Sequence, residues 1–132
     1  MDKVLNEEVV VSAGDAELIG QVLESRRRVI GLEAAAAEEL RERMSAARVV
    51  DGAELPDDRA AIGSTVSYEE AAAGTRRAVT LAVPENANPA AGRISVLSPV
   101  GSALVGRRAG DRVEAQLPDG RSLELRIASI GR

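Results

Sequence analysis

Residues 112–127 read RVEAQLPDGRSLELRI, and this stretch decides the fold class. Apolar and polar residues alternate on both sides of its centre, which is the period of a strand with one buried face. Pro118-Asp119-Gly120 separates the two runs, and proline fixes φ where glycine permits a positive φ. The stretch predicts two antiparallel strands joined by a tight turn. The expected core-facing residues are Val113, Ala115, Leu117, Leu123, Leu125 and Ile127.

The same alternation appears in three earlier segments, at 65–69, 77–83 and 93–97. A long polar loop, 84–92, separates the second from the third. We therefore expect residues 64–132 to form a small domain built on an antiparallel sheet. Its further inward residues would be Val66 and Tyr68, Val79, Leu81 and Val83, and Ile94 and Val96, with Leu97 on the opposite face.

One short helix is predicted between the third segment and the hairpin, at SPVGSALVG (98–106). Ser98 suits an N-cap, Pro99 suits the first helical position, and Gly106 can end the helix. The segment is long enough for about two turns, which would cross the sheet.

The amino-terminal part has a helical period instead. A first helix should begin at Ser12 or Asp15 and end near Arg26, Arg27 and Arg28; Val9 to Val11 before it would be a strand or an extended lead-in. Its apolar face would hold Leu18, Ile19, Val22 and Leu23.

A second helix is expected from Leu32 to Arg48, with Glu39 and Arg43 as an outward i, i+4 ion pair. Together the two helices predict an antiparallel helical hairpin, a short coiled coil, over residues 1–50, followed by a linker at 51–63. The expected fold class is thus α+β. The apolar stripe of the second helix would be Leu32, Ala36, Leu40, Met44 and Ala47.

The composition excludes several classes of chemistry. The chain has no Cys and no His, so thiolate nucleophiles and Ser-His-Asp mechanisms are excluded. Lys3 is the only lysine, so neither a P-loop nor a Schiff-base lysine is expected. We expect no enzyme activity, cofactor, metal site or small-molecule substrate.

The charge and hydropathy patterns indicate what the protein can bind and where it is expected to be found. A net charge of −4 and a single aromatic residue argue against a stable direct nucleic-acid site, which would be basic and offer stacking rings. No apolar run approaches the roughly 20 residues of a membrane span, and the first residues do not form a secretory signal. We therefore expect a cytoplasmic protein with no membrane partner.

Several short motifs follow one another in the carboxy-terminal half: SPVGSALVG at 98–106, Gly110-Asp111, and LPDG at 117–120. In order and spacing they resemble the carboxy-terminal domain of the GreA/GreB transcription factors, which implies an FKBP-like fold. A wider set is similar to the Rnk branch of this family, the regulators of nucleoside diphosphate kinase. That set is DAE at 15–17, LPDD at 55–58, GSTV at 63–66 and VTLAVP at 79–84.

The resemblance implies RNA polymerase as the partner, because in the family the loop and helix beginning Ser-Pro contact a coiled coil on the polymerase rim. By this correspondence Ser98, Pro99 and Val100 would bind the partner; the plainer interpretation is that they only start a helix. Cleavage factors also carry an acidic pair at the hairpin tip that helps hold a catalytic Mg²⁺. Here the tip carries Arg26, Arg27 and Arg28 and no carboxylate.

The leading hypothesis is therefore a non-catalytic regulator that binds RNA polymerase near its secondary channel without stimulating transcript cleavage. The alternative is a regulator of nucleoside diphosphate kinase and nucleotide pools, acting directly or indirectly. A third hypothesis, an isomerase or a cleavage factor, is disfavoured because there is no Phe or Trp for an FKBP-type pocket and no acidic tip.

Overall fold

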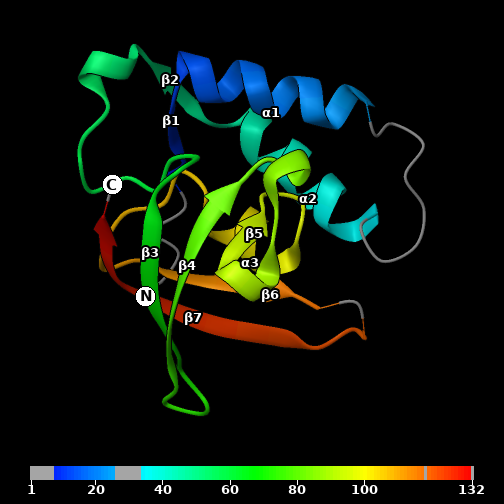
Figure 1. The fold of residues 1–132 in the computed structure, drawn as a ribbon, viewed down its shortest axis with the longest axis vertical. Coiled ribbons are helices and arrows are strands. Elements are labelled where there is room, and N and C mark those ends of the chain that lie inside the picture. The colour runs from blue at the N-terminus through cyan, green and yellow to red at the C-terminus, as the bar shows by residue number, and fades with distance from the viewer. Residues whose placement is uncertain (1–7, 26–33, 118, 132) are drawn as a thin grey trace.

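The computed structural model describes residues 8–25, 34–117 and 119–131, and in these ranges the chain has a mixed α+β fold. A curled five-stranded sheet has the order β5-β4-β3-β7-β6, and a second sheet pairs β1 with β2 (Figure 1). The strands of the larger sheet are β3 (Thr65–Glu70), β4 (Arg76–Ala82), β5 (Arg93–Ser95), β6 (Arg112–Gln116) and β7 (Ser122–Gly131).

The hairpin predicted at 112–127 is confirmed. β6 and β7 pair antiparallel, with Val113 opposite Leu125. The Leu117 amide donates to the Arg121 carbonyl at 2.8 Å, and Gly120 has the positive φ, 90°, that its place in the turn requires. The turn chemistry in the sequence was therefore sufficient to fix this part of the sheet.

β3 lies at the centre of the larger sheet, antiparallel to β4 on one side and to β7 on the other. Val66 and Tyr68 on its inner face are buried, as predicted. Its register with β7 shifts between Ser67 and Tyr68, which marks a bulge. Bulges increase local twist, and this one contributes to the curl of the sheet.

The prediction of a wholly antiparallel sheet is wrong for β5, which runs parallel to β4. The connection 83–92 contains two 3-10 turns, η4 (Pro84–Asn86) and η5 (Pro89–Ala91). A parallel strand needs a connection that returns along the sheet. This short one suffices because β5 begins opposite Thr80, close to the end of β4.

The amino-terminal residues form α1 (Ala13–Ser25) and α2 (Ala34–Ser45), with β1 (Val10–Ser12) before α1 and β2 (Arg48–Val50) after α2. Ser12 is the cap, since its Oγ accepts from the Asp15 amide at 3.1 Å. The second helix does not reach Arg48 as predicted. Arg48–Val50 instead pairs parallel with Val10–Ser12, a role that suits its two β-branched valines.

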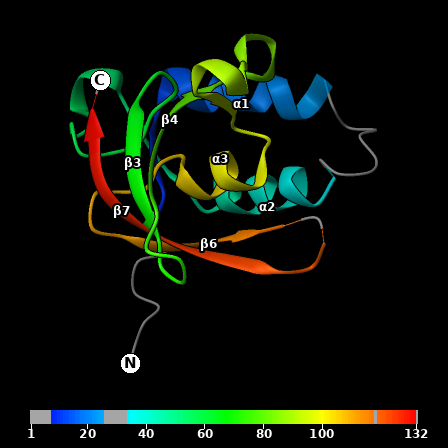
Figure 2. The ribbon, with the colours of Figure 1, turned by 60° about the horizontal axis from the view of Figure 1, so that its bottom comes forward.

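A single hydrophobic cluster joins the two helices to the sheet and to α3 (Pro99–Leu104). α3 lies in the hollow of the curled sheet with α2 beside it (Figure 2). Leu18 was expected in this core but is 43% exposed, because Ile19 and Val22 occupy the inward face of α1. The buried members from α1 and α2 are Ile19, Val22, Leu23, Ala37 and Leu40.

The segment predicted as a linker is partly built into the fold. It contains the 3-10 turn η3 (Gly52–Glu54), and Arg59, Ala60 and Ala61 near its end are buried. Arg59 donates to the Gly106 carbonyl at 3.1 Å, and the Gly106 amide donates to the Ala60 carbonyl at 2.7 Å. The division into units at 1–50, 51–63 and 64–132 stays a prediction.

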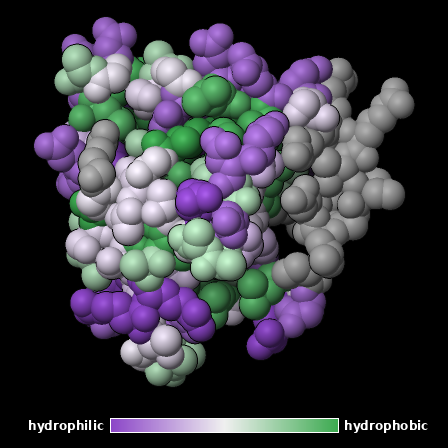
Figure 3. Space-filling view, in the orientation of Figure 1, coloured by the Kyte–Doolittle hydropathy of each residue, from purple (hydrophilic) through white to green (hydrophobic). Residues whose placement is uncertain are grey.

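Ion pairs link the end of β3 to its neighbours β4 and β7. Glu69 on β3 accepts from Arg76 and Arg126, each at 3.0 Å, and Glu70 accepts from Arg77 at 3.0 Å. In Figure 3 a band of hydrophilic side chains crosses the lower part of the molecule, above the tip of the β3–β4 hairpin. Among the described residues, no helix combines the length and the apolar character needed to cross a bilayer.

We expect Glu69→Gln to lower the melting temperature slightly at about pH 7 and to have no effect at about pH 2. Hydrogen bonds from Arg126 and then Arg76 hold the pKa of Glu69 below its usual value. The stabilisation is therefore present above the unfolded-state pKa, about 4.3, and is lost as the pH falls through the lower folded-state pKa. Thermal unfolding at both pH values measures it. Glu114→Gln, an exposed carboxylate on β6, is the control; an equal effect of Glu69→Gln at both pH values would contradict the prediction.

Candidate docking site

Ser98, Pro99 and Val100 form a corner between β5 and α3, which we call the docking corner. All three are half-buried. Ser98 is the N-cap of α3, with extended backbone angles (φ −74°, ψ 158°), and Pro99 is at the first helical position. The sequence therefore located both the helix start and its cap correctly.

A network of serine hydrogen bonds fixes the docking corner. The Ser95 carbonyl accepts from the Ser98 amide at 2.9 Å and from Ser98 Oγ at 2.7 Å. Ser98 Oγ in turn accepts from the Gly101 amide at 3.1 Å, and Ser95 Oγ accepts from the Leu97 amide at 2.9 Å. The two serine hydroxyls bond backbone groups of the turn and of the start of α3, so the docking corner has little freedom to change shape.

The core lies directly under the docking corner. Leu97 was expected on the face opposite Val96, but both are fully buried. β5 ends at Ser95, so the two residues lie in a turn and no longer alternate. Gly101 is buried against Ser95: a Cβ there would overlap the Ser95 carbonyl oxygen and lie 2.9 Å from Ser98 Oγ. Only glycine allows α3 to approach the end of β5 this closely.

Arg43 of α2 contacts α3, the helix that begins at the docking corner. Its ion pair with Glu39, at 2.8 Å, is confirmed. It does not face outward as predicted, however: the side chain is only 17% exposed, and Nη1 donates to the Ser102 carbonyl of α3 at 2.7 Å. This contact could not be predicted, because helical spacing shows which residues share a face but not what that face meets.

The predicted hairpin tip, Arg26 to Arg28, lies outside the described residues. Between the described parts of α1 and α2 there is an open cavity of about 630 Å³. Arg41 lines it, with an ion pair to Glu38 at 3.4 Å and a hydrogen bond to the Leu23 carbonyl at 3.4 Å. The cavity is also lined by Gly20, Leu23, Glu24 and Glu38.

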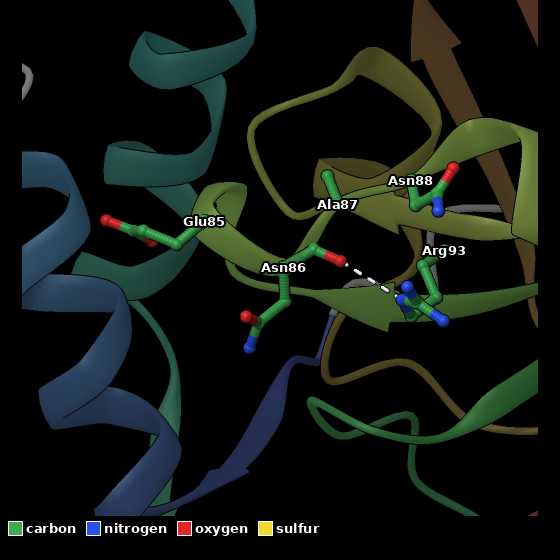
Figure 4. Close-up of a pocket in the computed structure, with 5 residues that line it drawn as sticks. All are labelled: Glu85, Asn86, Ala87, Asn88 and Arg93. Atoms are coloured by element: carbon green, nitrogen blue, oxygen red, sulfur yellow. Dashed lines mark hydrogen bonds between the residues drawn. The ribbon is translucent and has the colours of Figure 1, made fainter.

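A second cavity, of about 510 Å³, lies at the loop between β4 and β5 (Figure 4). Arg93 donates to the Asn86 carbonyl at 3.1 Å, and the Glu85 side chain points away from Arg93 toward the helices. Asn88 and Ala87 complete the lining. Because the charged groups do not converge, the cavity offers no acid–base pair.

Tyr68 has a shifted pKa because of its place in the fold. Burial raises the pKa of the Tyr68 hydroxyl, and this residue lies in the core. Within the described ranges, no three acidic side chains gather closely enough to hold a metal ion. The docking corner itself contributes one hydroxyl, which is already hydrogen-bonded, so its arrangement suits contact with another surface.

Residues 55–132 match the family described as "Transcription elongation factor, GreA/GreB, C-term". The chain belongs to this family.

Relatives agree with this assignment. The chain is 38% identical to the transcription elongation factor GreA of Desulfovibrio desulfuricans over 69% of this chain and 56% of that protein. It is 36% identical to GreA of Solidesulfovibrio magneticus over 81% of this chain and 65% of that protein. The chain thus spans between half and two thirds of the length of these curated relatives.

Solved structures extend the similarity to the helices. A GreA/GreB elongation factor from Nitrosomonas europaea superposes with a TM-score of 0.73 at 30% identity, over 95% of this chain and 98% of that one. Gfh1 of Thermus aquaticus superposes with a TM-score of 0.50 at 26% identity, over 96% and 99% of the two chains. The first of these similarities covers the helical part as well as the sheet.

Proposed function

We propose that this protein is a non-catalytic transcription regulator of the bacterial cytoplasm. It binds RNA polymerase near the secondary channel through the docking corner, and it does not stimulate transcript cleavage. The observation that carries the proposal is the docking corner itself, a family motif held half-exposed on a turn that hydrogen bonds keep rigid. The FKBP-like description of the sheet domain, the short coiled coil and the Rnk branch are parts of the same proposal.

The docking corner has the properties of a protein contact. A preorganised surface loses little conformational entropy on binding, so more of the contact energy appears as affinity. Pro99 and Val100 supply apolar area, and Val100 also packs against the core, which holds it in place. A rigid apolar corner suits the flat or grooved surface of another helix pair.

The absence of cleavage stimulation follows from reach and charge. The described parts of α1 and α2 have 13 and 12 residues and eight residues connect them, so a helical hairpin of this length reaches at most about 25 Å. The sequence between them, 26–33, contains three arginines and one carboxylate, Glu33. Mg²⁺ requires hard oxygen ligands, and adjacent positive charge opposes its binding. A short pair of helices with a basic connection is poorly suited to bring a metal-binding carboxylate pair to a distant active site.

We expect Val100→Glu to weaken binding to core RNA polymerase at least tenfold, because an unpaired carboxylate in an apolar contact is costly to desolvate. Binding is measured by co-purification and by titration against immobilised polymerase, with circular dichroism to check the fold. Val49→Glu is the matched control, since Val49 is 51% exposed and lies on β2. If the intact, folded wild-type protein neither binds at micromolar concentration nor competes with a cleavage factor, the proposal fails.

A second assay addresses cleavage directly. In stalled elongation complexes the protein should add nothing to the polymerase's own cleavage and should reduce the cleavage stimulated by GreA. Stimulated cleavage that is abolished by Glu24→Gln or Glu33→Gln would overturn the non-catalytic part of the proposal.

The Rnk-like resemblance carries the alternative, regulation of nucleoside diphosphate kinase and of nucleotide pools. A complex with the kinase would support direct regulation, and changed pools without a complex would support an effect through transcription. Unaltered pools in a deletion strain would remove this alternative.

A further inference from the structure

The helix that bears the docking corner is very short. α3 has six residues, and helices of this length are not stable alone, so both of its ends need partners. At the N-terminal end, Ser98 and Pro99 supply the cap. The requirement for a partner at the C-terminal end directs attention to Arg43.

Arg43 supplies that partner from α2. Nη1 donates to the Ser102 carbonyl at 2.7 Å, and Nη2 lies 2.8 Å from Glu39 Oε1. A guanidinium presents several donors in a fixed plane, so it can bond a carbonyl and a carboxylate at the same time. A cation is also favourable at the C-terminal end of a helix. Of the last carbonyls of α3, those of Gly101 and Leu104 accept from the Val105 and Arg107 amides, and that of Ser102 accepts from Arg43.

Ser102 connects this contact to the docking corner. Its amide donates to the Ser98 carbonyl at 2.8 Å, and its hydroxyl donates to the Pro99 carbonyl at 3.2 Å. Ser102 is buried, so the hydrogen bonds at this residue are shielded from water. An ion pair and then hydrogen bonds thus connect Glu39 on α2 to the docking corner.

We infer that Arg43 is a positioning residue for partner binding: it closes the C-terminal end of α3 and holds the docking corner at a fixed place relative to α2. The helix pair and the docking corner then meet the polymerase as one rigid surface. The inference rests on the proposed function for the identity of the partner, but the positioning itself is a property of the free protein.

The test compares Arg43→Gln with Arg41→Gln. Arg41 is on the same helix and also forms an ion pair, but among the described residues it bonds Glu38 and the Leu23 carbonyl, away from α3. Hydrogen exchange of the Ser102 and Val105 amides reports on α3 in the free protein, and titration against core polymerase reports on binding. Circular dichroism and melting curves confirm that each variant is folded.

We expect Arg43→Gln to speed exchange of the two α3 amides about tenfold and to weaken polymerase binding about tenfold, a shift of about 1.4 kcal/mol. Arg43→Lys should restore part of both effects, because an ammonium can reach the carbonyl but cannot bond carbonyl and carboxylate as a fork. Arg41→Gln should change neither.

Unchanged exchange in a folded Arg43→Gln variant would overturn the inference. Faster exchange with unchanged polymerase affinity would also overturn it, since α3 would then loosen without moving the docking corner. If the wild-type protein does not bind polymerase, the proposed function fails, while the exchange comparison still decides whether Arg43 holds α3.

Discussion

Gly101→Ala should destabilise the protein by about 3 kcal/mol and lower its melting temperature by about 10 °C. Gly101 is buried, and an added Cβ would overlap the Ser95 carbonyl oxygen. That carbonyl cannot move freely, because it accepts from both the amide and the hydroxyl of Ser98. α3 would have to shift away from β5, and the docking corner would move with it. Thermal and urea unfolding measure the loss of stability.

Gly20→Ala is the matched control for this substitution. A Cβ at Gly20 meets no atom within 4 Å, and alanine is the better helix former by up to about 1 kcal/mol. The control should therefore be neutral or stabilising. Equal stability of Gly101→Ala and the wild type would mean that α3 does not approach β5 closely in solution.

Leu40→Ala should cost about 3 kcal/mol, since truncating a fully buried leucine leaves a cavity. Leu40 belongs to the cluster that also contains Leu104 of α3 and Leu125 of β7. Loss of packing at α2 should therefore also lower the stability of the sheet. Urea unfolding followed by far-ultraviolet circular dichroism and by Tyr68 fluorescence should give one shared, lowered midpoint.

Leu18→Ala is the control, because Leu18 is on α1 but is 43% exposed, and its truncation should cost less than about 1 kcal/mol. Two separated transitions in Leu40→Ala, with the Tyr68 signal unshifted, would contradict the prediction. They would instead favour independent units at 1–50 and 64–132.

Strand positions could be predicted from the sequence where one face is buried and one faces water. β3, β6 and β7 have this pattern, and their inward residues were identified correctly. The direction of β5 could not be predicted, because a three-residue strand carries no information about which way it pairs. β2 was not predicted. Its first residue, Arg48, was assigned to the helix because Ala46 and Ala47 continue the helical pattern, and pairing with β1 is a long-range contact that local propensity does not report.

The candidate site divides in the same way. Ser98 and Pro99 were identified because capping is a local signal with a known chemistry. Gly101 and Arg43 were not, since their roles depend on Ser95 and Ser102 approaching from other elements. Helical spacing correctly indicated the Glu39–Arg43 ion pair, but only the packing of α2 against α3 gives that pair its further contact.

The β1–β2 pair bears on how chains of this family can differ in length. Hydrogen bonds hold Val10–Ser12 beside Arg48–Val50, so the two ends of the helix pair are fixed next to each other. Turns added to both helices beyond the β1–β2 pair would extend outward and leave the larger sheet undisturbed. The entropic cost of closing a longer connection rises only slowly with its length. The helix pair could therefore differ in length between members of the family without a change in the sheet.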